Sequence, residues 1–477
     1  MATPIGPELL RYERLAAELA SLIERGVLAP GDRLPSVRRL ASEKRLSMST
    51  VVQALRRLED AGKVEARPQS GYYVRLRGPQ RAVPQLRNTP EEAMPVAISQ
   101  RLERVLQAAR QPGMAPLVAA WPAPELLPIA ALNRLYAKVV RTHPTLLQSG
   151  SHHSPGETAL LHQLVRRSLA WGGPLPTEEL LVTNSCTEAL GLCLRAVTQP
   201  GDTVAVESPA YYLMLQLLES LGLKALEIPC DARHGMSLEA LDLASRQGKV
   251  AACLLVPNVS NPLGSTMPDE KKRALVALTA ARGIAVIEDD IYGDLHFGDT
   301  RPWPLKAFDT TGNVMLCGSF SKSLSPALRL GFVAAGRYRQ AVSLQKTICS
   351  GASNPVTQMV VAEYLDSGAY ERHLRSLRRH YETQVAAMRD AVARHFPAET
   401  RISQPHGAFV LWLELPEAVN TSALYERAVR EGVPFVPGEL FSASGLYRNC
   451  LRLNCGNPHT PEIEDAVRRL GHLITHP

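Results

Sequence analysis

The feature that most constrains this chain is the alternation, from Leu160 onward, of short apolar segments with longer segments of helical spacing. The apolar segments begin at residues 181, 203, 251, 284, 314 and 331, and each has the length and composition of a buried strand. Strands that alternate with helices form a mainly parallel sheet, whose ligand site lies at the carboxyl ends of the strands. We therefore predict an α/β body with its chemistry at the ends of these strands.

Length and composition set further limits. The chain has 477 residues, so two or three domains are expected. Hydrophobic residues make up 45% and charged residues 21%, which excludes a disordered or fibrous protein. The sequence has no run of about 18 apolar residues and no basic-then-apolar leader, so we predict neither a membrane span nor a secretory signal. The eight cysteines include no Cys-x-x-Cys pair, which favours free thiols in the cytoplasm.

Positive charge is concentrated at the start of the chain. Residues 1–81 hold 15 lysines and arginines against 9 aspartates and glutamates, which is nearly all of the net charge of +7. This asymmetry indicates a nucleic-acid-binding head on a near-neutral body. A solvated basic helix face would give the same count of charges. The local sequence pattern is therefore needed to distinguish it from a nucleic-acid-binding head.

The head, residues 1–77, shows a helical pattern followed by a hairpin pattern. Apolar spacing and turn residues predict three helices, over 8–25, 35–43 and from Ser47 or Ser49 to Gly62, and then a strand, a tight turn and a second strand over 63–74. Three short helices and a β-hairpin make a winged helix-turn-helix, whose third helix enters a major groove.

The amino-acid sequence of the head also resembles that of a known family. The segment IERGVLAPGDRLPSVRRLASEKRLSMSTVVQALRRLEDAGKVEARPQSGYYV, residues 23–74, resembles the DNA-binding domain of the GntR regulators. The family often has arginine where this chain has Met48, and methionine cannot make the bidentate contact of arginine to guanine. The alternative is a winged helix that serves packing or dimer contacts. The resemblance implies that the residues facing DNA are Arg38, Ser47, Ser49, Thr50, Gln53, Gln69, Ser70 and Gly71.

A proline-containing stretch follows the head. Residues 78–97 include Pro84, Pro90 and Pro95 and show little apolar periodicity. Proline fixes φ and removes a backbone donor, so we predict an extended, semi-rigid linker that lets the head move relative to a body of residues 98–477.

The strongest chemical signal in the body is Ser319-Phe320-Ser321-Lys322, directly after a predicted strand. Burial and a neighbouring cation lower the pKa of a lysine, and its neutral amine can then form a Schiff base. The two serines and Arg329 can hold a phosphate. Ser319 and Lys322 also fit the Ser-x-x-Lys signature of penicillin-recognising enzymes, but the Ser-Asp-Asn and Lys-Thr-Gly segments of those enzymes are absent.

Further candidates follow other predicted strands. Asp289 could pair with a protonated heterocyclic nitrogen, and the Tyr292 hydroxyl could reach a phenolic oxygen of the same ring. Each of these features alone would be explained by ordinary turn chemistry or packing. Their order along the chain, taken together, is what indicates a cofactor site. The remaining candidates are Asn261 at a turn, Ser185-Cys186-Thr187 at a helix start that can receive a phosphate, and Tyr211 as a ring that can stack on a planar cofactor.

Over residues 120–477 these motifs together resemble the fold type I aminotransferases, which use pyridoxal 5′-phosphate. The resemblance implies a large, mainly parallel-sheet part over about 130–350 and a small α+β part over about 360–477. It further implies Lys322 as the internal aldimine, Asp289 on the pyridine nitrogen, Asn261 and Tyr292 on the ring oxygen, Tyr211 stacked on the ring, Arg452 on a substrate carboxylate, and a phosphate site made of Ser185, Cys186, Thr187, Ser319, Ser321 and Arg329.

The body departs from the family pattern at three places. The usual Leu-Arg after Gly156 is Leu160-Leu161, the usual Gly-Gly of the small part is His406-Gly407, and Cys186 stands where alanine is common. His406 lies nearer the expected mouth of the site, so it can affect which ligand is admitted. None of these departures removes a residue that the cofactor chemistry requires.

A GntR head on an aminotransferase-like body is the layout of the MocR subfamily of bacterial regulators. The first hypothesis is a DNA-binding transcription regulator that senses pyridoxal 5′-phosphate, or an amino acid or amine that forms an external aldimine. The alternative is a working aminotransferase with an accessory head. The resemblance implies a cytoplasmic homodimer, associated with the nucleoid when it binds its operator. We predict no metal site, because no further ligand accompanies His152-His153.

Overall fold

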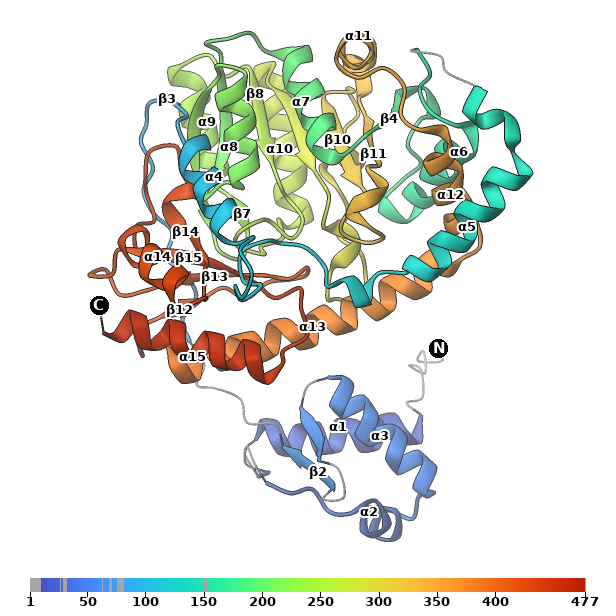
Figure 1. Cartoon of the computed structure of the whole chain (residues 1–477), viewed down its shortest axis with the longest axis vertical. Coiled ribbons are helices and arrows are strands. Elements are labelled where there is room, and N and C mark those ends of the chain that lie inside the picture. Colours follow the sequence, from blue (N-terminus) through green and yellow to red (C-terminus); the bar gives the residue numbers. More distant parts are fainter. Residues whose placement is uncertain are drawn as a thin grey trace, which may run out of the picture. The chain divides into compact units, whose positions relative to one another are not determined.

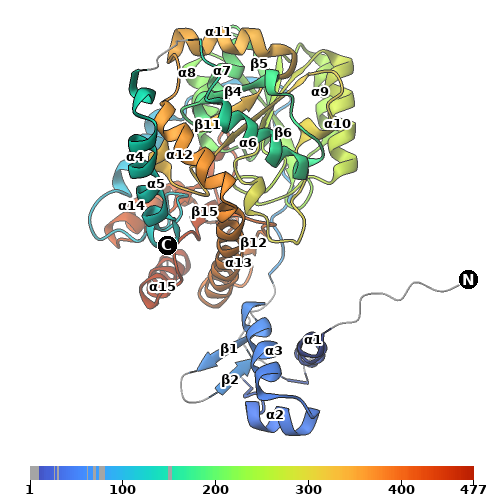
Figure 2. The same cartoon turned by 90° about the vertical axis from the view of Figure 1, so that its right-hand side faces the viewer.

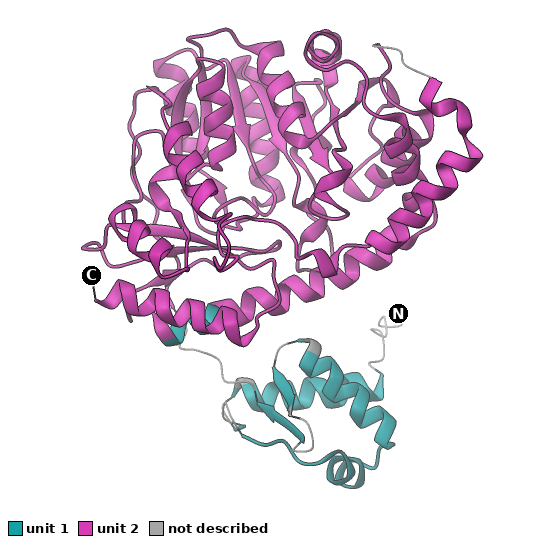
Figure 3. Ribbon diagram, in the orientation of Figure 1, with its two compact units in different colours: residues 1–80, 389–394 teal, residues 81–388, 395–477 magenta. Residues whose placement is uncertain are grey.

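The structure is a computed structural model that describes residues 10–25, 27–28, 32–61, 63–67, 71–74, 81–148 and 153–476. The chain divides into two compact units (Figure 3). The first unit consists of residues 1–80 together with 389–394, and it contains the head predicted for residues 1–77. The second, which we call the body, consists of residues 81–388 and 395–477.

The head contains three helices followed by an antiparallel hairpin (Figure 2). Apolar side chains from all three helices and from both strands form its core, and they include Leu15, Leu19, Leu40, Val51 and Val74. The predicted winged helix-turn-helix is therefore confirmed. Its elements are α1 (Arg11–Glu24), α2 (Val37–Lys44), α3 (Met48–Asp60), β1 (Val64–Arg67) and β2 (Gly71–Val74).

Serine caps fix the start of α2 and of α3. The Ser36 hydroxyl accepts a hydrogen bond from the Arg39 amide at 3.3 Å, and the Ser47 hydroxyl accepts one from the Thr50 amide at 3.1 Å. Between the two helices Arg45 takes a left-handed conformation with φ 52°, which ends α2. Caps of this kind stabilise the first turn of a helix, so they define where α2 and α3 begin.

The body is built on a large, mainly parallel sheet (Figure 1). Within the described residues it has nine strands, eight of them in the order β3-β6-β5-β8-β9-β10-β11-β4, with β7 paired to β6. Only β11 and the short β3 and β7 run against the others. The strands are β3 (Met94–Pro95), β4 (Leu180–Thr183), β5 (Thr203–Ser208), β6 (Lys224–Asp231), β7 (Gly235–Met236), β8 (Ala252–Leu255), β9 (Ala285–Asp289), β10 (Val314–Ser319) and β11 (Gly331–Ala334).

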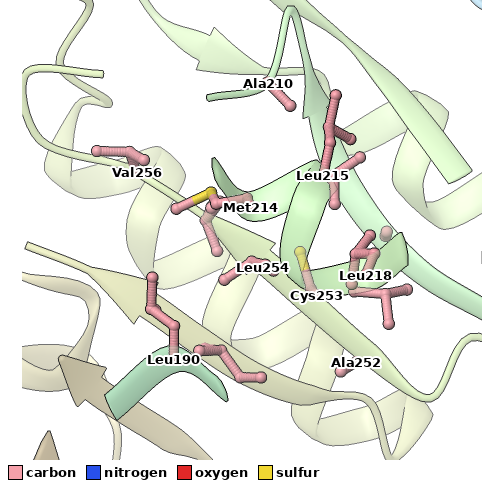
Figure 4. Close-up of a cluster of buried hydrophobic side chains, with 14 of the residues drawn as sticks. Leu190, Ala210, Met214, Leu215, Leu218, Ala252, Cys253, Leu254 and Val256 are labelled. Atoms are coloured by element: carbon pink, nitrogen blue, oxygen red, sulfur yellow. The ribbon is translucent and has the colours of Figure 1, made fainter. Parts of the chain in front are cut away.

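Helices flank this sheet and bury its apolar faces. Figure 4 shows Leu190 of α7 and Met214 and Leu215 of α8 beside Cys253 and Leu254 of β8. The strands read as continuous apolar runs because both of their faces are covered. The helices of this part are α4 (Ser99–Ala108), α5 (Ile129–Thr142), α6 (Thr158–Ser168), α7 (Cys186–Val197), α8 (Tyr212–Ser220), α9 (Leu238–Gln247), α10 (Asp269–Arg282), α11 (Arg339–Cys349) and α12 (Pro355–Asp366).

The C-terminal part of the body is a smaller α+β layer around a four-stranded antiparallel sheet in the order β12-β13-β15-β14. The long helix α13 (Ala369–His395) leads into it from the large part (Figure 1). The predicted aminotransferase-like division into a large and a small part agrees with this arrangement. Its elements are β12 (Arg401–Ile402), β13 (Val410–Glu414), α14 (Thr421–Arg430), β14 (Val436–Pro437), β15 (Cys450–Asn454) and α15 (Pro461–Thr475).

Most of the segment predicted as a linker lies on the body. Arg87 pairs with Glu414 at 3.2 Å and donates a hydrogen bond to Asn449 at 2.6 Å, while β3 extends the large sheet beside β6. Residues 81–97 are therefore part of the second unit and are not a free spacer. The side chains and the backbone of this segment find partners on the body. Residues 78–80 lie outside the described residues.

Candidate functional site

Lys322 lies near the carboxyl end of β10 and is buried, with 6% of its surface exposed. Its Nζ donates a hydrogen bond to the carbonyl of Ala120 at 2.6 Å and lies 3.5 Å from the centre of the Trp121 ring. Burial, and then the nearby Arg452 cation, lower the pKa of Lys322 to about 7. A large fraction of this amine is therefore neutral and nucleophilic near pH 7.

Asp289 is the last residue of β9, and its position beside β10 brings its carboxylate near Lys322. The carboxylate oxygen Oδ1 accepts hydrogen bonds from the Ile291 amide at 3.0 Å and from the Cys186 thiol at 3.2 Å. Burial raises the pKa of Asp289 to about 6, and the two hydrogen bonds oppose that rise. Within the described residues the second oxygen accepts no hydrogen bond, so it is available to a ligand.

Cys186 takes a different role from the one expected of it. Cys186 was predicted to be a phosphate ligand, but its buried thiol contacts Asp289. Cys186 is the first residue of α7, so only its main-chain amide is left for a phosphate at the helix start.

Three further predicted residues meet beside this carboxylate. Arg452 on β15 is fully buried, and its guanidinium lies 3.5 Å from the Asn261 side-chain oxygen and donates to the Val118 carbonyl. Tyr292 is buried next to them, and burial raises the pKa of its hydroxyl. Asn261 Nδ2 and Arg452 Nε are buried with no hydrogen-bond partner among the described residues.

The residues predicted to hold a phosphate lie at the start of α7, at the end of β10 and before β11. A Cβ added at Gly331 would lie 2.7 Å from the main chain of Ser185, so the start of β11 closely approaches this helix end. Ser319 Oγ lies 3.0 Å from Ser321 Oγ and donates to the Leu330 carbonyl at 2.9 Å. Arg329 is exposed, with φ 45° and no partner within the described residues, and Thr187 is exposed on the first turn of α7.

The two adjacent tyrosines differ in their surroundings. The Tyr212 ring is buried, with the Arg452 guanidinium 5.4 Å from its centre and the Phe441 ring 5.4 Å away. Tyr211 is half-buried, and its ring lies 4.7 Å from that of Tyr212 at 50°. Tyr212 thus packs on the arginine, which leaves Tyr211 as the ring available to a planar ligand.

A segment that the sequence analysis missed closes over the two cations. The carbonyls of Val118 and Ala120 accept hydrogen bonds from Arg452 and Lys322, and Trp121 is 42% exposed beside the lysine. Main-chain oxygens carry no side-chain signal, so only Trp121, an aromatic residue in an irregular segment, could have been noticed.

A second missed feature is an ion-pair network next to Asp289. Asp290 pairs with Arg301 and accepts a hydrogen bond from Asn258 at 2.9 Å. Arg301 also pairs with Asp294 at 2.7 Å, and the Arg167 and Arg301 cations hold the pKa of Asp294 well below its usual range. Such a network anchors the loop that follows β9. The doubled aspartate was a signal in the sequence, but its distant arginine partners were not.

The head presents its predicted DNA-facing residues at the surface. Arg38 on α2 and Ser47, Ser49 and Gln53 at the start of α3 are exposed, and Thr50 is half-buried. Gly71 opens β2 with φ 107°, while Gln69 and Ser70 lie outside the described residues.

Two other predicted residues can be placed. His406 is exposed, and its backbone amide donates to the Gly264 carbonyl at 2.9 Å, close to the turn that holds Asn261. His153 lies 3.5 Å from Thr347, and His152 is outside the described residues. Among the helices of the described residues, none is long and apolar enough to cross a membrane.

Comparison with known proteins supports both units. The profile of the aminotransferase class I and II family matches residues 130–470, and that of the bacterial regulatory proteins of the gntR family matches residues 11–74. The uncharacterized HTH-type transcriptional regulators YjiR and YdcR of Escherichia coli (strain K12) are each 38% identical to the chain, over 98% and 97% of it and 99% of their own lengths. The chain belongs to the GntR regulators with an aminotransferase class I and II body. This is the predicted MocR-type architecture.

Solved structures agree with the fold of this regulator's body. LysN, an alpha-aminoadipate aminotransferase of Thermus thermophilus complexed with N-(5′-phosphopyridoxyl)-L-leucine, matches with a TM-score of 0.70 and 29% identity, over 80% of this chain and 99% of that one. Kynurenine aminotransferase of Pyrococcus horikoshii matches with a TM-score of 0.74 and 28% identity, over 79% and 94%. The family depends on pyridoxal 5′-phosphate, which is thus the cofactor of this fold.

The residues of the regulator fit this cofactor. Among the described residues Asn261 Nδ2 has no partner and could donate to the ring oxygen, and the second oxygen of Asp289 could accept from a protonated ring nitrogen. The amine of Lys322 is available for the aldehyde, and Arg329 and the start of α7 supply cationic and amide groups for the phosphate.

Proposed function

We propose that the regulator binds DNA through its head, holds pyridoxal 5′-phosphate on Lys322 in its body, and responds to the cofactor or to an amino acid or amine. The observation that carries the proposal is the meeting of a buried lysine of lowered pKa with a half-satisfied carboxylate, in a body joined to a gntR domain. A structural ion pair alone would leave neither the amine so readily neutral nor the second Asp289 oxygen without a partner among the described residues.

Each side chain has a definite task in this proposal. Asp289 holds the ring nitrogen protonated, Asn261 and Tyr292 contact the ring oxygen, and Tyr211 stacks on the ring. When bound, the cofactor supplies an aldehyde that exchanges amines and a ring that withdraws electrons. The phosphate is held by Ser185, Thr187, Ser319, Ser321 and Arg329, together with the main-chain amide of Cys186.

Arg452 links ligand binding to the segment that covers the site. A ligand carboxylate pairs with Arg452 and competes with the Val118 carbonyl for its guanidinium. It also offsets the positive charge that lowers the pKa of Lys322, so the lysine Nζ holds its proton more firmly. A ligand shifts the state of the head only by binding two arrangements of the body with different affinity, and the segment around Val118 is the element that differs.

The regulator acts as a homodimer in this proposal. Large apolar side chains are exposed on three elements of the body: Val140 on α5, Leu147 on the short helix Pro144–Gln148, and Leu344 and Ile348 on α11. α5 contacts the short helix Pro144–Gln148, so Val140 and Leu147 lie on neighbouring elements, and exposed apolar side chains gathered on one surface are typical of a protein interface. When one head of the dimer is bound to its half-site, the second head is held at a raised effective concentration near the other half-site, so the two heads together bind one operator more tightly.

A second candidate function is transamination, with the head as an accessory. It is favoured by the completeness of the site, because Lys322, Asp289 and Arg452 are all present and close together. The 2-aminoadipate transaminase of Thermus thermophilus is 32% identical over 78% of this chain and 93% of its own length.

Two assays on the same preparation test the proposal. The cofactor-loaded protein is footprinted on the promoter beside its own gene, and it is incubated with an amino donor and a 2-oxo acid. The proposal predicts a footprint that changes when one amino compound also changes the cofactor absorbance. Steady multiple turnover without any footprint would contradict it and support the enzyme.

A further inference from the structure

Met48 is an exposed apolar residue at the start of the helix that the head offers to DNA. It is the first residue of α3, and 54% of its surface is exposed. Val51, Ala54 and Leu55 of the same helix are fully buried, but Met48 neither belongs to the core of the head nor packs against it. Its side chain is therefore not part of the packed core of the described head.

The neighbours of Met48 have other tasks. Ser47 caps α3, and its hydroxyl lies 2.8 Å from that of Ser49 and 2.7 Å from that of Thr50. The Ser47 hydroxyl thus contacts the other two, whereas Met48, between Ser47 and Ser49 in the sequence, is exposed and carries no hydrogen-bonding hydroxyl. The first turn of α3 offers one long, flexible apolar group surrounded by hydroxyls.

The position of Met48 at the start of α3 determines which part of DNA its side chain can contact. In a helix-turn-helix the first residues of the second helix contact base edges in the major groove, and the gntR match over residues 11–74 includes the whole of α2 and α3. Exposed Arg38 and Arg45 lie on α2 and in the turn that precedes Met48, where cations suit the DNA backbone.

The major groove offers only one chemical group that the Met48 side chain can contact favourably. Base edges there present hydrogen-bond donors and acceptors, and the only apolar group among them is the C5-methyl of thymine. A thioether side chain is a poor hydrogen-bonding partner for the polar edges, but it packs well against a methyl group. A side chain that cannot bind guanine as arginine does can therefore still distinguish thymine.

We propose that Met48 is a specificity-determining residue that contacts the C5-methyl group of a thymine in each half-site of the operator. The inference rests on the proposed DNA binding by the head, and it adds the base and the atom that the head recognises. Burial of one methyl group accounts for about a fourfold gain in affinity.

The test uses the full chain loaded with pyridoxal 5′-phosphate. Duplexes with a randomised core are selected by binding, and each thymine of the enriched sequence is then replaced by deoxyuridine, which removes only the methyl group. We expect one thymine per half-site at which the replacement weakens binding about fourfold, measured by fluorescence anisotropy. In Met48→Ala the same replacement should have no effect.

Two variants and one modified base make the test specific. Met94→Ala removes another exposed methionine, on β3 of the body, and should respond to deoxyuridine as the unchanged protein does. Cytosine at the same position should bind more tightly when it carries a 5-methyl group. Met48→Arg should move the preferred base at this position to guanine.

The outcomes separate this inference from the proposed function. Enrichment of a sequence whose thymine methyl groups matter equally to the unchanged protein and to Met48→Ala would overturn the role of Met48 and leave DNA binding intact. If no sequence is enriched at all, sequence-specific DNA binding and the role of Met48 fall together.

Discussion

The head and the body carry their functional groups in opposite environments. In the head the predicted or proposed DNA contacts Arg38, Ser47, Met48 and Gln53 are exposed, while in the body Lys322, Asp289 and Arg452 are buried. Residues 1–81 contain no histidine and no cysteine, so all 13 histidines and 8 cysteines belong to the rest of the chain. The binding of DNA by the head should therefore respond to salt, and the binding of the cofactor by the body should respond to pH.

The largest expected effect is that of salt on the head. If two heads contact six or more phosphates, DNA affinity should fall about a thousandfold between about 50 and 200 mM salt, because each contact releases a counterion. Cofactor affinity, which depends on a buried site, should change far less over the same range. Anisotropy and absorbance titrations in one salt series measure both.

A matched variant sharpens this contrast. Arg38→Ala should lower the slope of log affinity against log salt by about one per head and leave the cofactor titration unchanged. Equal salt slopes for DNA and for the cofactor would break the distinction between an exposed and a buried site.

The next effect concerns the body alone. Asp289→Ala should weaken cofactor binding about ten- to a hundredfold, because a hydrogen bond to a charged partner is lost in a buried site. Asp289→Asn keeps the shape of the side chain but not its charge, and it should lose nearly as much. Equilibrium dialysis of the cofactor measures the effect, and unchanged affinity in both variants would remove the assigned role of Asp289.

A smaller effect is expected from pH, which should change the rate of cofactor attachment to the body but not the DNA affinity of the head. The pKa of Lys322 is lowered to about 7, so its neutral, reactive fraction rises with pH, from about one tenth at pH 6 to about nine tenths at pH 8. Stopped-flow absorbance should show cofactor attachment accelerating about tenfold over this range. DNA affinity of the cofactor-loaded protein should stay nearly constant, because residues 1–81 contain no histidine or cysteine to titrate there. A flat attachment rate would mean that the amine keeps an ordinary pKa.

The smallest effect tests the contact between Cys186 and Asp289. The thiol donates to the carboxylate and lowers its pKa, so in Cys186→Ala the Asp289 pKa should rise above its present value of about 6. Fewer carboxylates are then charged at pH 6, and cofactor affinity should fall about threefold there but hardly change at pH 8. Cys186→Ser keeps a donor and serves as the control. A loss of equal size at both pH values would indicate packing alone.

Much of the fold and of the site was predictable, for a definite reason. The strands were visible as apolar runs, and strands of a parallel sheet end at one edge, so Asp289 and Lys322 had to come together. Asn261 and Tyr292 were candidates because they follow predicted strands, and the resemblance added Arg452. The structure gathers all three beside Asp289 and Lys322.

What escaped prediction depends on contacts between distant or main-chain groups. The carbonyl of Ala120 reaches Lys322 across 202 residues, and nothing in the sequence marks a carbonyl. The thiol of Cys186 turned to Asp289 because the first turn of α7 faces the end of β9. Residues 81–97 resembled a linker because prolines interrupt their periodicity, yet Arg87 ties them to Glu414.

The central claim is that the body holds its cofactor through the amine of Lys322. Cofactor-saturated protein is treated with borohydride, which fixes that bond, and its peptides are mapped by mass. We predict a label on the Lys322 peptide, no label in Lys322→Ala, and an unchanged label in Lys346→Arg, whose buried lysine pairs with Glu188. Saturated protein that leaves Lys322 unlabelled would contradict the account.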